Sequence, residues 1–271
     1  MLPVGLTGFP TLLALLAQAG VADGSLIHPP DMTSLAKILL RWLHFLAGIT
    51  WIGLLYFFNL VNVNFMKALD AQTKGKVIPE LMPRALWWFR WGALVTVLAG
   101  FTYYAMYIVA ADAKNAGLNT WGILGWFLLV WLVAFGIEYL MIQRVNKGSV
   151  LALLIGLLVI IGAWVILWLL GAPSESPDRV ADTLSNKSLS IGIGGGLGII
   201  MLLNVWGIIW PAQKRIIAWT KENAEQGTAI PAESAKLGRQ AFLASRANTW
   251  LSLPMLFFMA ASHGDYIWFA R

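Results

Sequence analysis

The amino-acid sequence predicts an all-α fold, a polytopic transmembrane helical bundle with six firm spans and a seventh apolar segment at the N-terminus. Hydrophobic residues make up 59% of the 271 residues and charged residues only 12%, which is about half the charged share of ordinary soluble domains. Apolar runs long enough to cross bilayer hydrocarbon, about 20 residues each, recur along the chain. The fifteen Trp and the many Gly within these runs favour membrane helices over the short alternating strands of a β-barrel.

The first element is an apolar stretch at residues 1–20, followed by a polar segment rich in Gly and Pro. Its short core and its Ala17-Gln18-Ala19 pattern are typical of a secretory signal peptide. No basic residue precedes the core, so we expect a retained apolar N-terminal helix, either spanning the membrane or lying at its interface. Pro10 would shape its first turns.

Six further runs are apolar and long enough to span. The first is longer than a bilayer requires, so we expect it to tilt or protrude. The longest polar connection covers residues 212–246, where we expect an amphipathic helix near 232–246. The sequence shows no internal repeat and no second domain, so residues 1–271 are interpreted as a single integral membrane domain. The predicted spans are residues 35–64, 87–111, 121–143, 149–171, 189–211 and 247–269.

Basic residues are distributed unevenly between the two sides that alternating spans define. Twelve of them lie in the connections 67–86, 144–148 and 212–246, against six on the other side. Because basic residues gather on the cytoplasmic side, we expect these three connections, 212–246 above all, to be cytoplasmic. Residues 172–188 and the C-terminus would then lie on the periplasmic side of a bacterial inner (cytoplasmic) membrane. The net charge of +6 follows from this topology and does not indicate nucleic-acid binding.

The composition also excludes several kinds of chemistry. The chain has no Cys, so it cannot contain disulfides, thiolate metal sites, iron–sulfur clusters or a covalently attached c-type haem. It carries no phosphate-binding loop, no Ser-His-Asp arrangement and no metal motif of recognised spacing.

The three histidines are all predicted to lie toward the outer face. His44 lies about ten residues into a span that enters from outside, His263 lies eight residues before the C-terminus, and His28 lies in a polar outer segment. Neutral imidazoles from two facing helices are a recurrent way to hold haem iron in a helical bundle. His44 and His263 are therefore candidate metal ligands of a b-type haem. The alternative is a structural histidine bonded to a nearby carbonyl or hydroxyl, with Thr50 and Ser262 close in sequence.

Two charged residues and a glycine run complete the candidates. Arg90 and Glu138 lie near the cytoplasmic ends of their spans, and an isolated charge there is costly, so we expect an ion pair between them. Separate snorkelling to the interface is the alternative. Five glycines between Gly192 and Gly198 remove side-chain bulk from one helix. They indicate either close helix packing or room for a flat cofactor or lipid tail.

Several motifs, in order along the chain, resemble the urate oxidase N-terminal domain family, the membrane portion of bacterial membrane-bound urate hydroxylases. They are Arg41-Trp42-Leu43-His44, Ala47-Gly48, Trp51-Ile52-Gly53, Tyr56-Phe57, Asn59, Trp87-Trp88-Phe89-Arg90-Trp91, Asn204-Val205-Trp206, Ile209, Pro211, Gln213-Lys214, Ser245-Arg246, Asn248-Thr249, Leu251-Ser252-Leu253-Pro254 and Ser262-His263. A weaker likeness links residues 41–66 to small membrane haem proteins of porphyrin metabolism.

The chain departs from the family pattern in three places. The glycine run at Gly192–Gly196 replaces a family histidine, and Ala247 stands where the Ser-Arg motif is followed by His. We also expect no C-terminal cytochrome c domain of the kind that full-length urate hydroxylases carry, since the sequence has no Cys to attach a c-type haem. The resemblance therefore supports the fold and a haem site at His44 and His263, and it weakens the case for urate chemistry.

The combined interpretation is an integral membrane electron-transfer or anchoring subunit that binds b-type haem near the outer face. It would work with membrane lipid, other subunits of a membrane complex and a separate c-type cytochrome. The alternative is a cofactor-free structural subunit of a larger respiratory or other bioenergetic complex. We expect a non-catalytic subunit in preference to a self-sufficient oxidoreductase, and we expect no nucleic-acid partner.

Overall fold

The computed structural model describes residues 30–145, 147–171 and 184–263, which fall into two units, residues 1–39 and 40–271. The apolar N-terminal segment 1–20, His28 and Arg271 lie outside the described residues, as does most of the predicted periplasmic loop. In the first unit, a helix begins at Met32, and the carboxylate of Asp31 caps it by accepting from the Ser34 amide at 2.9 Å.

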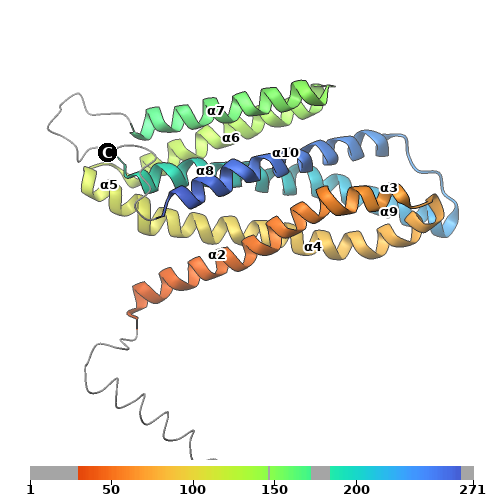
Figure 1. The fold of residues 1–271 in the computed structure, drawn as a ribbon, viewed down its shortest axis with the longest axis horizontal. Helices are drawn as coiled ribbons and strands as arrows, with labels where there is room; N and C mark the ends of the chain where they lie inside the picture. The colour runs from red at the N-terminus through yellow and green to blue at the C-terminus, as the bar shows by residue number, and fades with distance from the viewer. Residues whose placement is uncertain (1–29, 146, 172–183, 264–271) are drawn as a thin grey trace, which may run out of the picture. The chain divides into compact units, whose positions relative to one another are not determined.

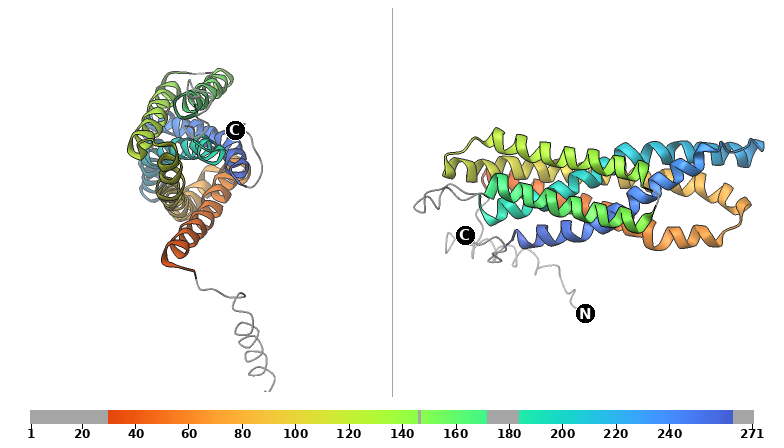
Figure 2. Two further views of the ribbon diagram at one scale, coloured as in Figure 1. Left: turned by 90° about the vertical axis from the view of Figure 1, so that its left-hand side faces the viewer. Right: turned by 90° about the horizontal axis from the view of Figure 1, so that it is seen from above.

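The described residues form helices that run side by side and contain no strand (Figures 1 and 2). Three long helices each contain a π-helical segment, a local widening of the helix that is often found at functional sites. The elements are α2 (Met32–Tyr56), η1 (Phe57–Asn62), α3 (Val63–Ala68), α4 (Ala71–Tyr103), η2 (Tyr104–Val109), α5 (Ala110–Ala116), α6 (Thr120–Arg144), α7 (Gly148–Gly171), α8 (Asn186–Asn204), η4 (Val205–Ile209), α9 (Trp210–Gln226) and α10 (Glu233–Ala261).

Short polar residues and glycines begin and end these helices. The side chains of Asp70, Asn119 and Ser185 cap α4, α6 and α8 by accepting hydrogen bonds from amides in the first turn. Gly117 and Gly227 end α5 and α9 with φ of 69° and 68°, a left-handed conformation that glycine adopts without strain. These five helix boundaries therefore follow from local capping.

Five helical segments are long and apolar enough to cross a membrane by length and composition. They are Met32–Ala68, Ala71–Ala116, Thr120–Arg144, Gly148–Leu170 and Asn186–Gln226. This result confirms a multi-pass membrane protein with an all-α bundle. The sixth predicted span, 247–269, falls on the second half of α10, whose described part is not among the five, and residues 264–269 lie outside the described residues. The number of spans therefore stays a prediction.

Two of the predicted connections, residues 67–86 and 212–246, are mostly helical in the structure. Between Ala68 and Ala71 the chain leaves the helix only briefly, and α4 runs through Pro79 and Pro83. Residues 212–246 form most of α9, a connection at 227–232 and the first half of α10, which includes the amphipathic helix expected at 232–246. Hydropathy marks only the part of a helix that crosses lipid. Helices α4 and α9 extend beyond that part because they pack against each other.

The bundle has two ends, which we name by their connections. The hairpin end contains residues 69–70, Val145, Lys147 and residues 227–232, and the cavity end contains residues 117–119, Ser185 and Ser262. Helix α8 lies at the centre: 61% of its most apolar stretch is buried, against 11–33% for the other four spans. The other helices present exposed apolar side chains outward, as contact with membrane lipid requires, for example Leu153, Ile160 and Trp164 of α7.

Candidate functional site

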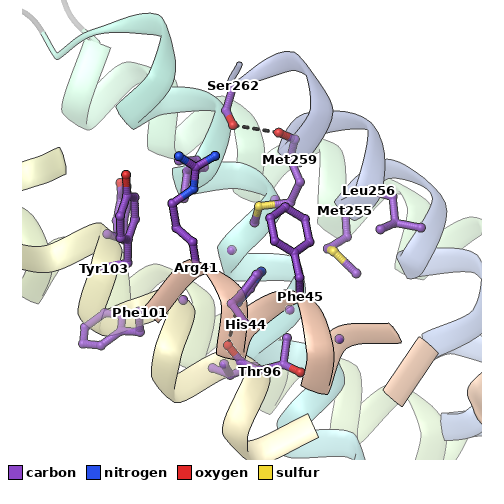
Figure 3. Close-up of a pocket in the computed structure, with 18 of the residues that line it drawn as sticks. Arg41, His44, Phe45, Thr96, Phe101, Tyr103, Met255, Leu256, Met259 and Ser262 are labelled. Carbon is purple, nitrogen blue, oxygen red and sulfur yellow. Dashed lines mark hydrogen bonds between the residues drawn. The ribbon is translucent and has the colours of Figure 1, made fainter. Parts of the chain in front are cut away.

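A cavity of about 650 Å³ lies at the cavity end of the bundle. Its walls come from α2, α4, η2, α8 and α10, with Phe127 contributed by α6. Figure 3 shows side chains from α2, α4 and α10 converging on it. Most of the lining is apolar, and the polar exceptions are concentrated on a few residues described below.

His44 projects from α2 into the wall of this cavity and is partly buried. Its Nδ1 lies 2.8 Å from the carbonyl oxygen of Thr96 on α4 (Figure 3). A carbonyl can only accept, so Nδ1 carries the proton and the lone pair of the neutral ring is on Nε2. Gly100 makes this position possible, because a Cβ there would lie 2.6 Å from Nδ1.

His263 lies on the rim of the same cavity, just beyond the end of α10, and is exposed. Its Nδ1 lies 2.9 Å from the carbonyl oxygen of Met259 and 3.0 Å from the hydroxyl of Ser262. Because the Met259 carbonyl is an acceptor, this ring also keeps its lone pair on Nε2. The structure therefore brings both predicted histidines to one cavity, His44 in the wall and His263 at the rim.

Two cations and one unpartnered donor mark the polar parts of the lining. Arg41, whose guanidinium lies 6.0 Å from the ring of Tyr103, and Lys187 in the first turn of α8 both line the cavity. Trp51 lines the cavity two helical turns beyond His44 along α2. It is 1% exposed, and its Nε1 has no hydrogen-bond acceptor. A buried N–H without an acceptor is rare in native proteins and calls for an explanation.

The glycine run on α8 has two faces with different roles. A Cβ at Gly196 would lie 1.9 Å from the indole of Trp131, and one at Gly194 would lie 3.0 Å from the Met255 carbonyl, so these glycines permit close helix packing. Gly198 lines the cavity, and a Cβ there would meet nothing within 4 Å. The run thus serves packing on one face and leaves space on the other.

The predicted ion pair between Arg90 and Glu138 does not form. The guanidinium of Arg90 stacks on the ring of Trp210 at 3.7 Å, while both carboxylate oxygens of Glu138 face the Asn204 amide at 3.2 and 3.3 Å. The prediction was wrong because sequence gives the depth of a residue along its helix and not the direction it faces. Snorkelling does not describe Arg90 either, since its Nε and Nη1 are buried.

Sequence reasoning missed a polar cluster in the bundle interior. Glu138, Asn204 and Asn248 are each no more than 1% exposed and are joined by hydrogen bonds. Asparagine within an apolar span is a signal that could have found it, because intramembrane polar residues require internal partners.

Comparison with protein-family models gives a match to the urate oxidase N-terminal family over residues 69–270. His263 lies within the matched range, whereas His44 and the other motifs of α2 precede it. No curated protein and no solved structure gives a significant match to the chain. The matched range covers the bundle from α4 to the C-terminal region, and the chain belongs to the urate oxidase N-terminal family.

Proposed function

We propose that this chain is an integral membrane electron-transfer subunit that binds a b-type haem in the large cavity. His44 would be the principal iron ligand and His263 the second. The observation that carries the proposal is the hydrogen bonding of His44. Its Nδ1 donates to the Thr96 carbonyl, so Nε2 keeps the lone pair that would bind iron. The ring lines a largely apolar cavity of about 650 Å³.

The residues present fit such a group in size and in chemistry. Cofactor and ligand cavities are typically about 300–1,000 Å³, apolar, with a few convergent polar groups. Arg41 and Lys187 could neutralise the two carboxylates of a haem, while Met255, Met259 and Phe101 would contact its apolar faces. When bound, the haem supplies one-electron oxidation and reduction.

The protein's own residues would tune this group in three ways. The hydrogen bond to Thr96 orients the His44 ring and increases the basicity of Nε2, as outer-shell carbonyls do for ligating histidines. The apolar walls exclude water and lower the local dielectric constant. Gly100 keeps the imidazole in place because the ring fills the space of its missing side chain.

The proposed setting is the bacterial inner membrane, with the cavity end on the periplasmic side. The cavity lies at that end, so a separate c-type cytochrome docking there would exchange electrons with the haem over the shortest distance. The clustering of basic residues at the hairpin end supports this orientation.

The visible absorption spectrum of the purified chain tests the proposal. A Soret band is expected when the chain is produced with sufficient haem. His44→Ala should abolish or shift that band, and His263→Ala should change six-coordinate iron to five-coordinate. His28→Ala is the matched control, because it removes the one histidine of the sequence that is not proposed as a ligand. If neither the purified chain nor the chain incubated with haemin shows the band, the cofactor-free structural subunit replaces this proposal.

A further inference from the structure

Glu138 is a buried carboxyl group within the membrane-crossing part of α6 and lacks a cation. It is 1% exposed, and no Lys, Arg or His in the described ranges forms an ion pair with it. Burying an ionised carboxylate without a counter-charge is strongly unfavourable. The charge of Glu138 therefore needs an explanation that the electron-transfer site does not provide.

Other charged and titratable groups on the helices packed around Glu138 have contacts elsewhere or lie at the ends of the bundle. Arg239 donates to the Val145 carbonyl, Arg246 lies over the ring of Phe242, and Arg90 stacks on Trp210. Helix α7 has no charged residue between 148 and 171. The remaining charged and titratable groups lie on α6 itself and on the neighbouring elements η2, α5, α8 and α10. They are Lys187, Tyr104, Tyr107, Asp112, Lys114, Tyr139, Arg144, Glu233 and Lys236.

The hydrogen bonds around Glu138 are one donor short. Asn248 donates from Nδ2 to the Met201 carbonyl at 2.9 Å, which fixes the orientation of that amide because a carbonyl only accepts. Asn248 Oδ1 then accepts from Asn204 Nδ2 at 2.9 Å, and the same Nδ2 faces both oxygens of Glu138. Asn204 Oδ1 is left buried without a partner. One proton on Glu138 would supply the missing donor.

A polar path leads from this cluster toward the hairpin end. Asn59 donates to the Ser245 hydroxyl at 2.8 Å, one helical turn from Asn248 along α10. Next to that pair lies a second cavity of about 120 Å³, lined also by Asn62 and Gln213. Asn62 is 8% exposed and its Oδ1 has no partner, so water molecules fit this cavity and would satisfy it.

The path also approaches the large cavity. Tyr56 and Ser252 share a hydrogen bond of 2.9 Å, and each lies about one turn from residues that line the large cavity. Both Asn59 and Asn62 belong to the π-helical segment η1, and Asn204 immediately precedes η4. Two π-helical segments therefore meet the polar path, which is consistent with a functional role.

We propose that Glu138 is a proton-binding site in the interior of the bundle, filled from water at the hairpin end by way of the Asn62 cavity. Its occupancy follows the redox state of the haem in the large cavity, and in this respect the inference rests on the proposed function. One electron from a one-electron donor reduces the haem, and one proton from water converts the Glu138 carboxylate to the acid. Oxidation releases both, and no other bond forms or breaks.

Redox titrations of the full chain at several pH values test this link, with a poised electrode as the electron source. In the natural chain, the haem midpoint potential should fall as pH rises, because reduction takes up a proton. Glu138→Gln, which has the same shape and cannot ionise, should make the potential independent of pH. Tyr139→Phe, next to it on α6, is the matched control and should keep the pH dependence. An unchanged pH dependence in Glu138→Gln overturns the inference.

Infrared difference spectra separate this inference from the proposed function. Reduction should produce the carbonyl stretch of a protonated carboxyl group, and this band should be absent in Glu138→Gln. If the chain shows no Soret band, the proposed function fails. In that case the infrared spectrum of the untreated protein decides about the proton site. A protonated-carboxyl band that disappears in Glu138→Gln supports the site, and a spectrum without this band overturns it. Asn62→Leu should slow proton uptake at least severalfold without changing the band, and an unchanged rate rules out this route.

Discussion

The two ring nitrogens of His44 have different surroundings, and this difference allows one side chain to be structural and functional together. Nδ1 is committed to the Thr96 carbonyl, whereas Nε2 has no such partner. The sequence could identify His44 as a polar residue in an apolar span, but its neighbour in sequence, Thr50, bonds instead to the Leu46 carbonyl. The actual partner, Thr96, is 52 positions away on another helix. Which face of that helix points toward His44 is determined by packing and cannot be read from the sequence.

Gly100→Ala should disrupt the His44 site while leaving the fold intact. The new Cβ would lie 2.6 Å from Nδ1, so the imidazole must leave its position and lose the bond to Thr96. Loss of such an outer-shell contact lowers affinity for a bound metal group by about tenfold or more. Haem retention during purification measures the effect. Gly125→Ala, on α6 and outside the cavity, adds a Cβ with nothing within 4 Å, so it is the control and should bind as the natural chain does.

Arg90→Lys should destabilise the bundle although it keeps the charge. The planar guanidinium stacks on Trp210 at 3.7 Å, and a lysine ammonium cannot reproduce that contact. We expect the free energy of unfolding to fall by about 1 kcal/mol. Thermal unfolding in detergent measures it. Arg84→Lys, at an exposed pair with Glu80, should change stability by much less, and equal losses in the two variants would argue against the stacking.

At the scale of whole helices, hydropathy located the elements well and their ends poorly. Five of the predicted spans correspond to apolar helical segments, because lipid requires a continuous hydrogen-bonded helix. The same helices continue past the apolar region at the hairpin end, where α4 begins at Ala71 and α9 runs to Gln226. Polar composition there indicates contact with water and says nothing about helix formation.

Gly196→Ala should destabilise the protein far more than Gly195→Ala. The indole of Trp131 is fixed by its Nε1 bond to the Gly192 carbonyl at 3.1 Å, so it cannot move away from a Cβ 1.9 Å from it. Overpacking a fixed core contact of this kind costs about 3 kcal/mol or more. At Gly195 the nearest atoms lie at 3.8 Å, an ordinary contact. Melting temperatures of the two variants in detergent should differ clearly, and similar values would mean that α8 can shift relative to α6.

At the scale of the molecule, the charge pattern and the position of the cavity distinguish the two ends of the bundle. The basic residues of the sequence gather at the hairpin end, and the large cavity with both histidines lies at the opposite end. The sequence could assign His44 and His263 to the same end from span alternation alone. It could not reveal the cavity, Trp51 in its lining or the Glu138 cluster, because each depends on which faces of several helices meet.

Single cysteines at the two ends of the bundle test this orientation, and the natural chain provides a clean background because it has no Cys. Leu118 is exposed in the connection between α5 and α6, and Thr228 is exposed in the turn between α9 and α10. In intact cells, an impermeant thiol reagent should label Leu118→Cys directly if the cavity end is periplasmic. Thr228→Cys should be labelled only after permeabilisation, because the twelve basic residues in the connections at its end favour the cytoplasmic side. The reverse pattern would place the cavity on the cytoplasmic side and move the proposed cytochrome partner and the proton entry to the opposite faces.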